Sequence, residues 1–132
     1  MSVKVKASLG TEKYYTEVIA GENRLITDEP TDKGGGNKGF NHFEILATSL
    51  ASCTAATLRM YIDRKGWIIP TINVEVELEN FPLTKTAIFK RSIDFGETMI
   101  EAEWSEKIFK IADACPVHKI LTNTIEVITK IS

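Results

Sequence analysis

Polar and apolar residues alternate at the start of the chain, a pattern typical of half-buried strands. The alternation at residues 3–8 predicts one strand, and the aromatic and β-branched run at residues 14–20 predicts a second. Gly-Glu-Asn at residues 21–23 predicts a turn into a third strand at residues 24–27. The chain is therefore expected to begin with three short strands.

Glycines dominate the stretch that follows these strands. Residues 34–39, Gly-Gly-Gly-Asn-Lys-Gly, formally match the G-x-G-x-x-G pattern of dinucleotide-binding loops. That fingerprint requires a strand directly before it, inside a βαβ unit, whereas residues 28–33 have the composition of a loop. We interpret residues 28–39 as a flexible connection within one domain.

A helix over residues 41–65 is the longest predicted element. Asn41 can cap its first turn with Glu44 three residues on, and Gly66 is a plausible stop. No charge occurs between residues 45 and 58, so the pattern predicts a helix buried on all sides. A chain of 132 residues can hardly surround such a helix by itself, so we expect a second subunit to cover part of it.

The second half of the chain predicts further strands and helices. In order, they are strands at residues 72–79 and 87–95, an acidic helix from residue 97 or 98 to about 114, a short helix at 117–123 and a strand at 124–131. Pro116 places Cys115 at the corner between the two helices. The order β-β-β-α-β-β-α-α-β is that of an α+β fold with mainly antiparallel strands, in a single domain over residues 1–132.

Charge and composition exclude several classes of function. The chain carries 16 basic and 18 acidic residues, a net charge of −2, and it is 43% hydrophobic. This balance gives no support for binding to nucleic acid or to a membrane surface. No run approaches about 18 uninterrupted apolar residues, and the N-terminus has no hydrophobic signal region, so a cytoplasmic protein is expected.

Two cysteines, Cys53 and Cys115, are the candidate reactive groups. In a reducing compartment they are either inert core residues or a redox pair. His118 lies three residues after Cys115, where it could be solvated, could tune the thiol, or could join both cysteines and His42 in a zinc site. The helical neighbours of Cys53 are uncharged, so a cation that activates it must come from elsewhere.

Three segments resemble the OsmC/Ohr family: residues 44–54, residues 57–67 and the pair Cys115-Pro116. The resemblance implies an OsmC-like fold with a long buried central helix, in an intertwined homodimer with active sites at the interface. It also implies a thiol peroxidase in which Cys53 attacks an organic hydroperoxide and Cys115 resolves the resulting sulfenic acid as a disulfide. A dithiol of the dihydrolipoyl type would reduce that disulfide, and no metal, flavin or haem would be required.

The chain departs from the family pattern at the charged groups that assist the cysteine. Phe43 stands where the peroxidases have a glutamate, and Glu44, one position later, is half a turn out of phase with Cys53. Arg24 is our first expectation for the activating cation and Lys13 the second, while Glu44 could orient a group of the partner chain. Turnover is expected to be slow, and the alternative is an OsmC-fold protein that binds a small molecule at the interface.

Overall fold

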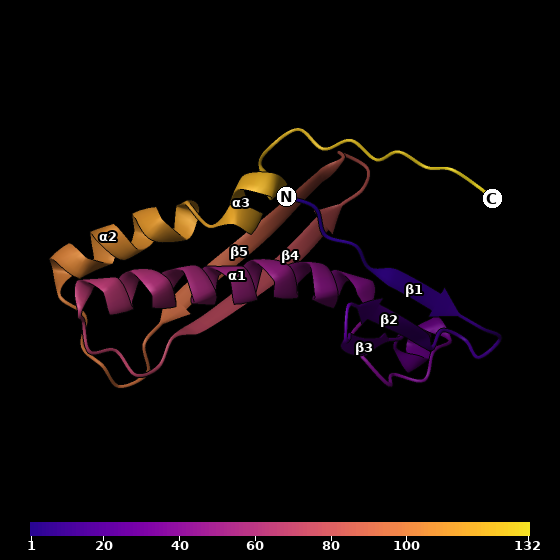
Figure 1. Ribbon diagram of the computed structural model, residues 1–132, viewed down its shortest axis with the longest axis horizontal. Helices are drawn as coiled ribbons and strands as arrows, with labels where there is room; N and C mark the ends of the chain where they lie inside the picture. Colours follow the sequence, from indigo (N-terminus) through magenta and orange to yellow (C-terminus); the bar gives the residue numbers. More distant parts are fainter. The chain divides into compact units, whose positions relative to one another are not determined.

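Antiparallel pairing builds both sheets of the computed structural model, which describes residues 1–132 (Figure 1). The chain forms two compact units, residues 1–46 and residues 47–132, and each is described by itself. In the first unit, β1 (Lys6–Leu9), β2 (Thr16–Ala20) and β3 (Asn23–Thr27) pair in that order. These strands confirm the three that were predicted.

The first strand is shorter and more exposed than its alternating pattern predicted. Its pairing begins only where Lys6 lies opposite Ile19, so Val3 and Val5 fall outside the sheet. All four residues of β1 are exposed, because within this unit nothing packs on either of its faces. The half-buried strand expected from residue 3 is therefore wrong in its start and in its burial.

The glycine-rich connection is organised around one buried carboxylate, that of Asp28, which is only 1% exposed. Oδ1 accepts the backbone N–H groups of Tyr14 and Glu29, and Oδ2 accepts those of Gly36 and Lys38, at 2.8–3.3 Å. Burial acts to raise the pKa of Asp28, but these four hydrogen bonds outweigh it and hold that pKa below the ordinary value. The expected flexible connection is thus a loop with its own polar centre.

Two glycines of this loop are required by close backbone contacts. A Cβ on Gly35 would lie 2.1 Å from the Glu29 carbonyl oxygen, and one on Gly39 would lie 2.3 Å from that of Ile26. A short 3₁₀ helix, η1 (Thr31–Lys33), precedes the glycines where a nucleotide-binding loop would have a strand. The glycines are therefore explained by packing.

The long helix α1 (His42–Lys65) confirms the longest predicted element, including both of its ends. The backbone N–H of Asn41 donates to Glu44 Oε1, and the N–H of Glu44 donates to Asn41 Oδ1, each at 2.8 Å. This is the reciprocal capping box that the sequence predicted. At the other end, Gly66 has a φ of 73°, and Trp67 donates back to the Ile62 carbonyl at 3.2 Å.

Burial of α1 follows one stripe rather than all of its faces. The buried residues are four apart, and they are Leu50, Thr54, Leu58 and Ile62. The chain supplies buried neighbours for one face only, as expected of a helix that one chain cannot surround, and burial of the other faces by a second subunit stays a prediction. By length and composition alone, α1 would also suit a membrane crossing, a test that the core helices of soluble proteins pass as well.

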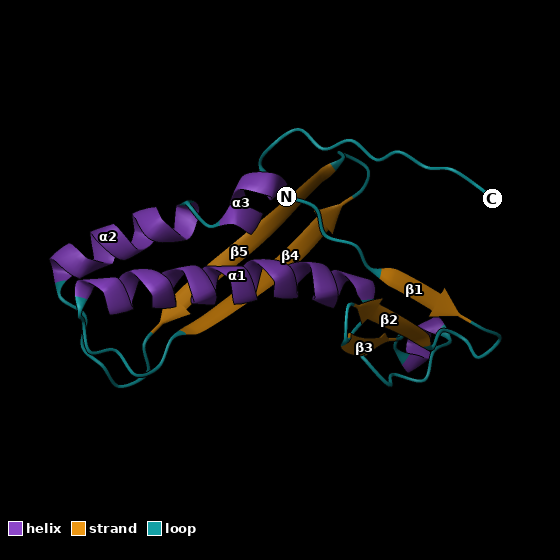
Figure 2. Cartoon of the chain, viewed as in Figure 1, coloured by secondary structure: helices purple, strands orange, loops and turns teal.

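In the second unit, β4 (Asn73–Phe81) and β5 (Thr86–Asp94) form a regular hairpin that confirms the two predicted strands (Figure 2). Partners run from Asn73 opposite Asp94 to Phe81 opposite Thr86. On one face of the hairpin, six half-buried residues lie opposite one another, namely Val74, Val76 and Leu78 on β4 and Ile93, Arg91 and Phe89 on β5. A single charged residue thus occurs on an otherwise apolar face.

The core of this unit lies between the C-terminal half of α1, the segments that flank the hairpin and α2 (Ala102–Asp113). Its buried members are Leu58, Ile62, Ile69, Phe95 and Ile108. Beside them the Trp67 and Trp104 rings stack with centroids 4.4 Å apart and an interplanar angle of 11°. These contacts tie the end of α1 to α2.

Three predictions for the end of the chain need correction. The acidic helix begins at Ala102 instead of residue 97 or 98, because Gly96 (φ 65°) turns the chain and its N–H donates to Asp94. Phe109, expected in the apolar stripe of that helix, is 69% exposed. The short helix is confirmed as α3 (Pro116–Leu121), but residues 124–131 form no strand, since no strand of this chain pairs with them.

Candidate functional site

The two cysteines, which are 62 positions apart in the sequence, meet in the second unit. Cys53 lies in the middle of α1 and is partly exposed, whereas Cys115 is the N-cap residue of α3 and is fully buried. Both are free thiols, and they are close enough for each to shift the pKa of the other. The fold thus brings the predicted reactive residues together.

The two sulfurs have different surroundings. Burial and the hydrogen bond to Cys115 raise the pKa of the Cys53 thiol, against smaller opposing effects of the Val117 N–H and the Thr57 hydroxyl. Burial also acts to raise the pKa of Cys115. Four hydrogen bonds outweigh that burial and lower its pKa; their donors are the Cys53 thiol, the His118 N–H, the Thr54 hydroxyl and the Val117 N–H. The two thiols therefore do not titrate independently of each other.

Arg91 is the charged residue of the hairpin's apolar face, and its side chain is only 12% exposed. One terminal nitrogen, Nη1, donates to Thr54 Oγ1 at 3.0 Å. The other, Nη2, donates to Asp113 Oδ1 and meets His118 Nδ1, both at 3.1 Å. The guanidinium thus links α1, α2 and α3, and it reaches the cysteine pair through Thr54.

The contact between Arg91 and His118 determines how the imidazole is protonated. A guanidinium has no acceptor, so His118 Nδ1 must accept the Arg91 N–H and the ring proton must lie on Nε2. Asp113 Oδ1 is 3.9 Å from the same Nδ1 and instead balances the charge of Arg91. His118 is 30% exposed, so the ring that was expected to be solvated or to tune Cys115 takes part in a polar network.

Three of the other predicted site residues have structural partners in the first unit. Arg24 pairs with Glu17 Oε2 at 2.6 Å, and Glu44 belongs to the capping box. Lys13 is exposed, and His42 Nδ1 lies 3.1 Å from Glu29 Oε1. No three potential metal ligands gather anywhere in the chain, so the zinc arrangement is not formed in this structure.

Arg91 was missed although its strand was predicted correctly. With Ile88, Lys90, Ser92 and Asp94 on the outer face of β5, Arg91 falls in phase with the inward Phe89 and Ile93. An arginine on an inward face needs a partner or a function, so the position of Arg91 in the alternation was the signal by which the sequence could have identified it. Thr54, one residue after Cys53, gave no such indication by its type.

A cleft of about 660 Å³ opens beside this network. Its polar residues are Arg91, Asp113, His118 and Thr122. The remaining lining residues are apolar, namely Leu50, Ala87, Ile88, Phe89, Ile93, Phe109, Ala112 and Leu121. An apolar cleft with a few convergent polar groups has the character of a small-molecule site.

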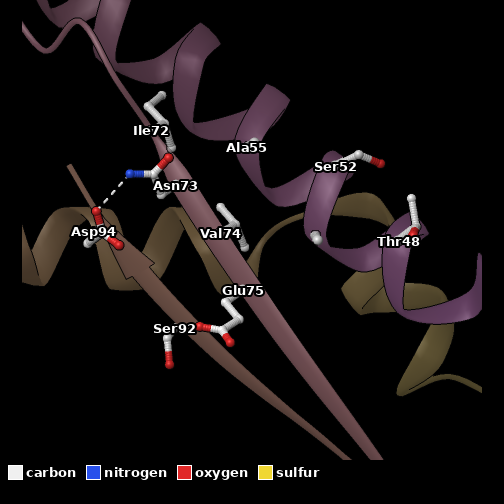
Figure 3. A pocket seen from close by; sticks show the side chains of 10 residues that line it. Thr48, Ser52, Ala55, Ile72, Asn73, Val74, Glu75, Ser92 and Asp94 are labelled. Atoms are coloured by element: carbon white, nitrogen blue, oxygen red, sulfur yellow. Dashed lines mark hydrogen bonds between the residues drawn. The ribbon is translucent and has the colours of Figure 1, made fainter. Parts of the chain in front are cut away.

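A second groove, of about 520 Å³, lies where small residues of α1 face β4 (Figure 3). Thr48, Ala51, Ser52 and Ala55 line it from the helix, and Asn73 and Asp94 are hydrogen-bonded to each other at its far side. It contains no thiol, imidazole or basic group. Its small side chains would allow another backbone to approach α1 closely.

Solved structures share this fold at low sequence identity. A protein from Psychrobacter arcticus, provisionally assigned to osmotic stress induction and the detoxification response, has a TM-score of 0.77 and 24% identity over 91% of this chain and 88% of its own. An OsmC-like protein from Mycoplasma pneumoniae has a TM-score of 0.70, with 21% identity over 92% and 87% of the two chains. The organic hydroperoxide resistance protein OhrB of Bacillus subtilis has a TM-score of 0.61, with 17% identity over 92% of this chain and 91% of its own.

Comparison by sequence gives a result of a different kind. No curated protein matches the chain. The family model described as OsmC-like protein matches residues 35–130, which include α1, both cysteines, Arg91 and the whole β4–β5 hairpin. This match covers well over half of the sequence and agrees with the architecture of the solved structures. The chain belongs to the OsmC family.

Proposed function

We propose that this protein is a cysteine-based peroxidase that reduces organic hydroperoxides, with Cys53 as the attacking residue and Cys115 as the resolving residue. The observation that carries the proposal is the proximity of the two free thiols, which are close enough for each to shift the pKa of the other, one of them accessible and the other buried. Several solved relatives by fold are named organic hydroperoxide resistance proteins, which supports the choice of substrate class. The proposal treats residues 1–132 as one OsmC-like domain.

The proposed chemistry has two oxidative steps and one reductive step. The Cys53 sulfur attacks the terminal oxygen of the hydroperoxide and the O–O bond breaks. Cys53 becomes a sulfenic acid, and the rest of the hydroperoxide leaves as an alcohol. Cys115 then displaces the hydroxyl group from Cys53 and forms a disulfide, with water as the product. An external dithiol of the lipoyl type returns both thiols by exchange, so no bound cofactor takes part. A reducing cytoplasm would keep the resting pair open.

Counting thiols tests this sequence of steps directly. One equivalent of cumene hydroperoxide should remove both thiols of the reduced protein and form one intramolecular disulfide. Cys115→Ser should stop at a sulfenic acid that dimedone traps, and Cys53→Ser should keep its remaining thiol. If both thiols survive excess hydroperoxide in the wild type, the peroxidase function is refuted.

A homodimer belongs to the same proposal. Its support is the unburied small-residue face of α1, at the groove that Ala51 and Ala55 line, and the exposed apolar residues of the unpaired segment 124–131. Ala55→Glu should abolish soluble dimer, because an unpaired charge would be buried at the interface. Sedimentation of the wild type as a folded monomer at micromolar concentration would contradict this part.

The cleft beside Arg91 supports a second candidate function, the binding of a small amphiphilic molecule without efficient turnover. Its apolar walls suit a hydrocarbon body, and Arg91 and His118 offer N–H donors to an oxygen acceptor. Thermal stabilisation by an acyl ligand that is equal in wild type and in Cys53→Ser, without loss of thiols to hydroperoxide, would favour this candidate. The thiol count therefore separates the two functions.

A further inference from the structure

The cleft beside Arg91 has a lining that does not include either cysteine. Its walls come from α1, β5, α2 and the end of α3. Its volume of about 660 Å³ falls within the range of sites for small organic molecules, which is about 300–1,000 Å³. The cleft is therefore a candidate binding site whose chemistry does not depend on the thiols.

Two apolar side chains of this cleft are left open by the chain. Phe109 of α2 is 69% exposed, although its helix buries other apolar residues, and Ile88 of β5 is 43% exposed. Both line the cleft, together with the half-buried Phe89 and Ile93. A hydrocarbon ligand would remove their open surfaces from water, which is favourable.

The charges at the polar end of the cleft cancel one another. The guanidinium of Arg91 donates from Nη2 to Asp113 Oδ1 at 3.1 Å. His118 is uncharged in this arrangement, because its Nδ1 accepts a hydrogen from the same Nη2 at 3.1 Å. The lining contains no other charged residue. A ligand with a charged head group would therefore find no free counter-charge, and the desolvation of that head group would be costly.

The same contacts decide which hydrogen-bonding groups stay available to a ligand. The ring proton of His118 lies on Nε2, and no side chain of the lining accepts it. Arg91 engages Asp113 through Oδ1, which leaves Oδ2 as an acceptor. The Thr122 hydroxyl donates to the His118 carbonyl at 3.0 Å, so its oxygen can only accept from a ligand. A hydroxyl head group matches this set, because it accepts and donates at once, whereas a carbonyl can only accept.

We propose that the cleft binds an uncharged amphiphile, a molecule with a hydroxyl head group on a hydrocarbon body. His118 Nε2 donates to the head-group oxygen, Asp113 accepts the head-group hydrogen, and Phe109 and Ile88 cover the body. The inference rests on the second candidate function and deepens it by naming the head group and the charge of the ligand.

Three probes that share an octyl body test the charge of the head group: 1-octanol, octanoate and octylammonium. Methyl NMR of the isoleucines locates the binding, since Ile88 and Ile93 line the cleft, whereas Ile68 is 83% exposed outside it. Octanol should shift Ile88 and Ile93 and leave Ile68 unchanged. The two ions should bind at least roughly tenfold more weakly.

The possible failures of this titration have different meanings. Octanoate or octylammonium binding as tightly as octanol would overturn the inference and leave the small-molecule function in place. No shift of Ile88 and Ile93 with any probe would refute both. Shifts of these two methyl groups that follow protein concentration, without a probe, would show that a second copy fills the cleft and would overturn the inference.

Asp113→Asn tests whether charge balance sets the selectivity. The amide oxygen can still accept from Arg91, but the guanidinium charge is no longer cancelled. Octanoate should therefore gain roughly tenfold in affinity relative to octanol. Asp63→Asn is the matched control, since Asp63 pairs with Arg59 at 3.0 Å and does not line the cleft. An unchanged selectivity in Asp113→Asn would refute the charge argument.

His118 supplies the test of the head-group contact. His118→Gln keeps an N–H donor and an acceptor for Arg91, whereas His118→Leu has neither. Octanol should bind His118→Gln nearly as it binds the wild type, and His118→Leu roughly tenfold more weakly. Equal affinities of His118→Leu and the wild type, with circular dichroism showing both folded, would refute the role of His118.

Cys53→Ser separates this inference from the peroxidase function. Octanol should bind Cys53→Ser as it binds the wild type, because the cleft lining does not include the thiols. Loss of octanol binding in this variant would place the ligand at the cysteine pair and overturn the inference. Survival of both wild-type thiols in excess hydroperoxide, with octanol binding intact, would count against the peroxidase function alone.

Discussion

Each unit of the molecule buries one acidic group, and the two groups are held differently. Asp28, in residues 1–46, is 1% exposed, and both of its oxygens are occupied by backbone N–H groups. Cys115, in residues 47–132, is fully buried, but its partners include the Cys53 thiol and the Thr54 hydroxyl, with Arg91 behind Thr54.

The difference lies in what the partners can exchange. Backbone amides hold their protons, so the shell around Asp28 can only stabilise the carboxylate and the loop that wraps it. A thiol can give up its proton and then form a covalent bond, so the shell around Cys115 can change its chemical state. The two groups are equally buried, but Asp28 anchors a loop in the first unit, whereas Cys115 belongs to a candidate reaction centre in the second.

The largest effect is expected from Arg91→Gln, which removes the cation from the reactive centre only. A hydrogen bond to a charged group contributes about 1.5–3 kcal/mol, so the rate of disulfide formation with hydroperoxide should fall roughly tenfold or more. Stopped-flow tryptophan fluorescence after mixing with hydroperoxide would measure that rate.

Two other arginines calibrate this result. Arg59→Gln should leave the rate unchanged, since Arg59 pairs with Asp63 and the Ile69 carbonyl. Arg24→Gln tests the cation first expected from the sequence, which pairs with Glu17 in this structure. A loss of rate in Arg24→Gln together with a normal Arg91→Gln would reverse the assignment of the activating group.

Asp28→Asn should produce the largest loss of stability within the first unit, because an amide nitrogen would replace one acceptor oxygen and leave two buried N–H groups unpaired. The pKa of Asp28 is lowered in the fold, so the carboxylate stabilises the loop above the ordinary value of 3.8. That stabilisation is lost as pH falls from 3.8 through the folded pKa. Hydrogen exchange of the Gly36 and Lys38 amides should show this loss in the wild type only. The titration of the two cysteines should be the same in Asp28→Asn as in the wild type, because the Asp28 loop and the cysteine pair are separate centres.

Gly39→Ala is the third change, and it tests the loop without touching charge. The added Cβ would meet the Ile26 carbonyl oxygen at 2.3 Å, and overpacking of this kind costs about 1–3 kcal/mol. Gly10→Ala is the matched control, since nothing lies within 4 Å of its Cβ position. Urea unfolding followed by circular dichroism would compare them, and equal midpoints would contradict the packing explanation.

The smallest effect belongs to the stability of Arg59→Gln. Arg59 Nη2 donates to the Ile69 carbonyl at 2.9 Å beyond the end of α1, and its side chain is 38% exposed. Loss of this partly solvated contact should cost about 1 kcal/mol in the free energy of unfolding. A loss of about 3 kcal/mol or more would contradict the assignment of this contact as partly solvated.

Local patterns sufficed for most of the architecture. The capping residues of α1, the alternation of β4 and β5 and the corner at Cys115 all depend on neighbours within a few positions, so each could be predicted from the sequence. The resemblance carried by the cysteine segments agrees with the family match.

The errors arise where a distant partner decides the outcome. Residues 124–131 alternate like a strand, but a strand requires an edge to pair with, and this chain offers them none. Arg91 acts because β5 brings it to Thr54 and His118, which lie 37 and 27 positions away in the sequence. The buried carboxylate of Asp28 likewise depends on amides spread from residue 14 to residue 38. Such contacts become visible only in three dimensions.

The stacked pair of Trp67 and Trp104 has a practical consequence for spectroscopy. These are the only two tryptophans of the chain, and both belong to residues 47–132. Tryptophan emission and the near-ultraviolet dichroism of the coupled indoles will therefore report on the thiol-bearing unit alone. Melting of the strand-rich first unit would leave both signals unchanged, so a single sharp fluorescence transition would not establish that the chain unfolds as a whole.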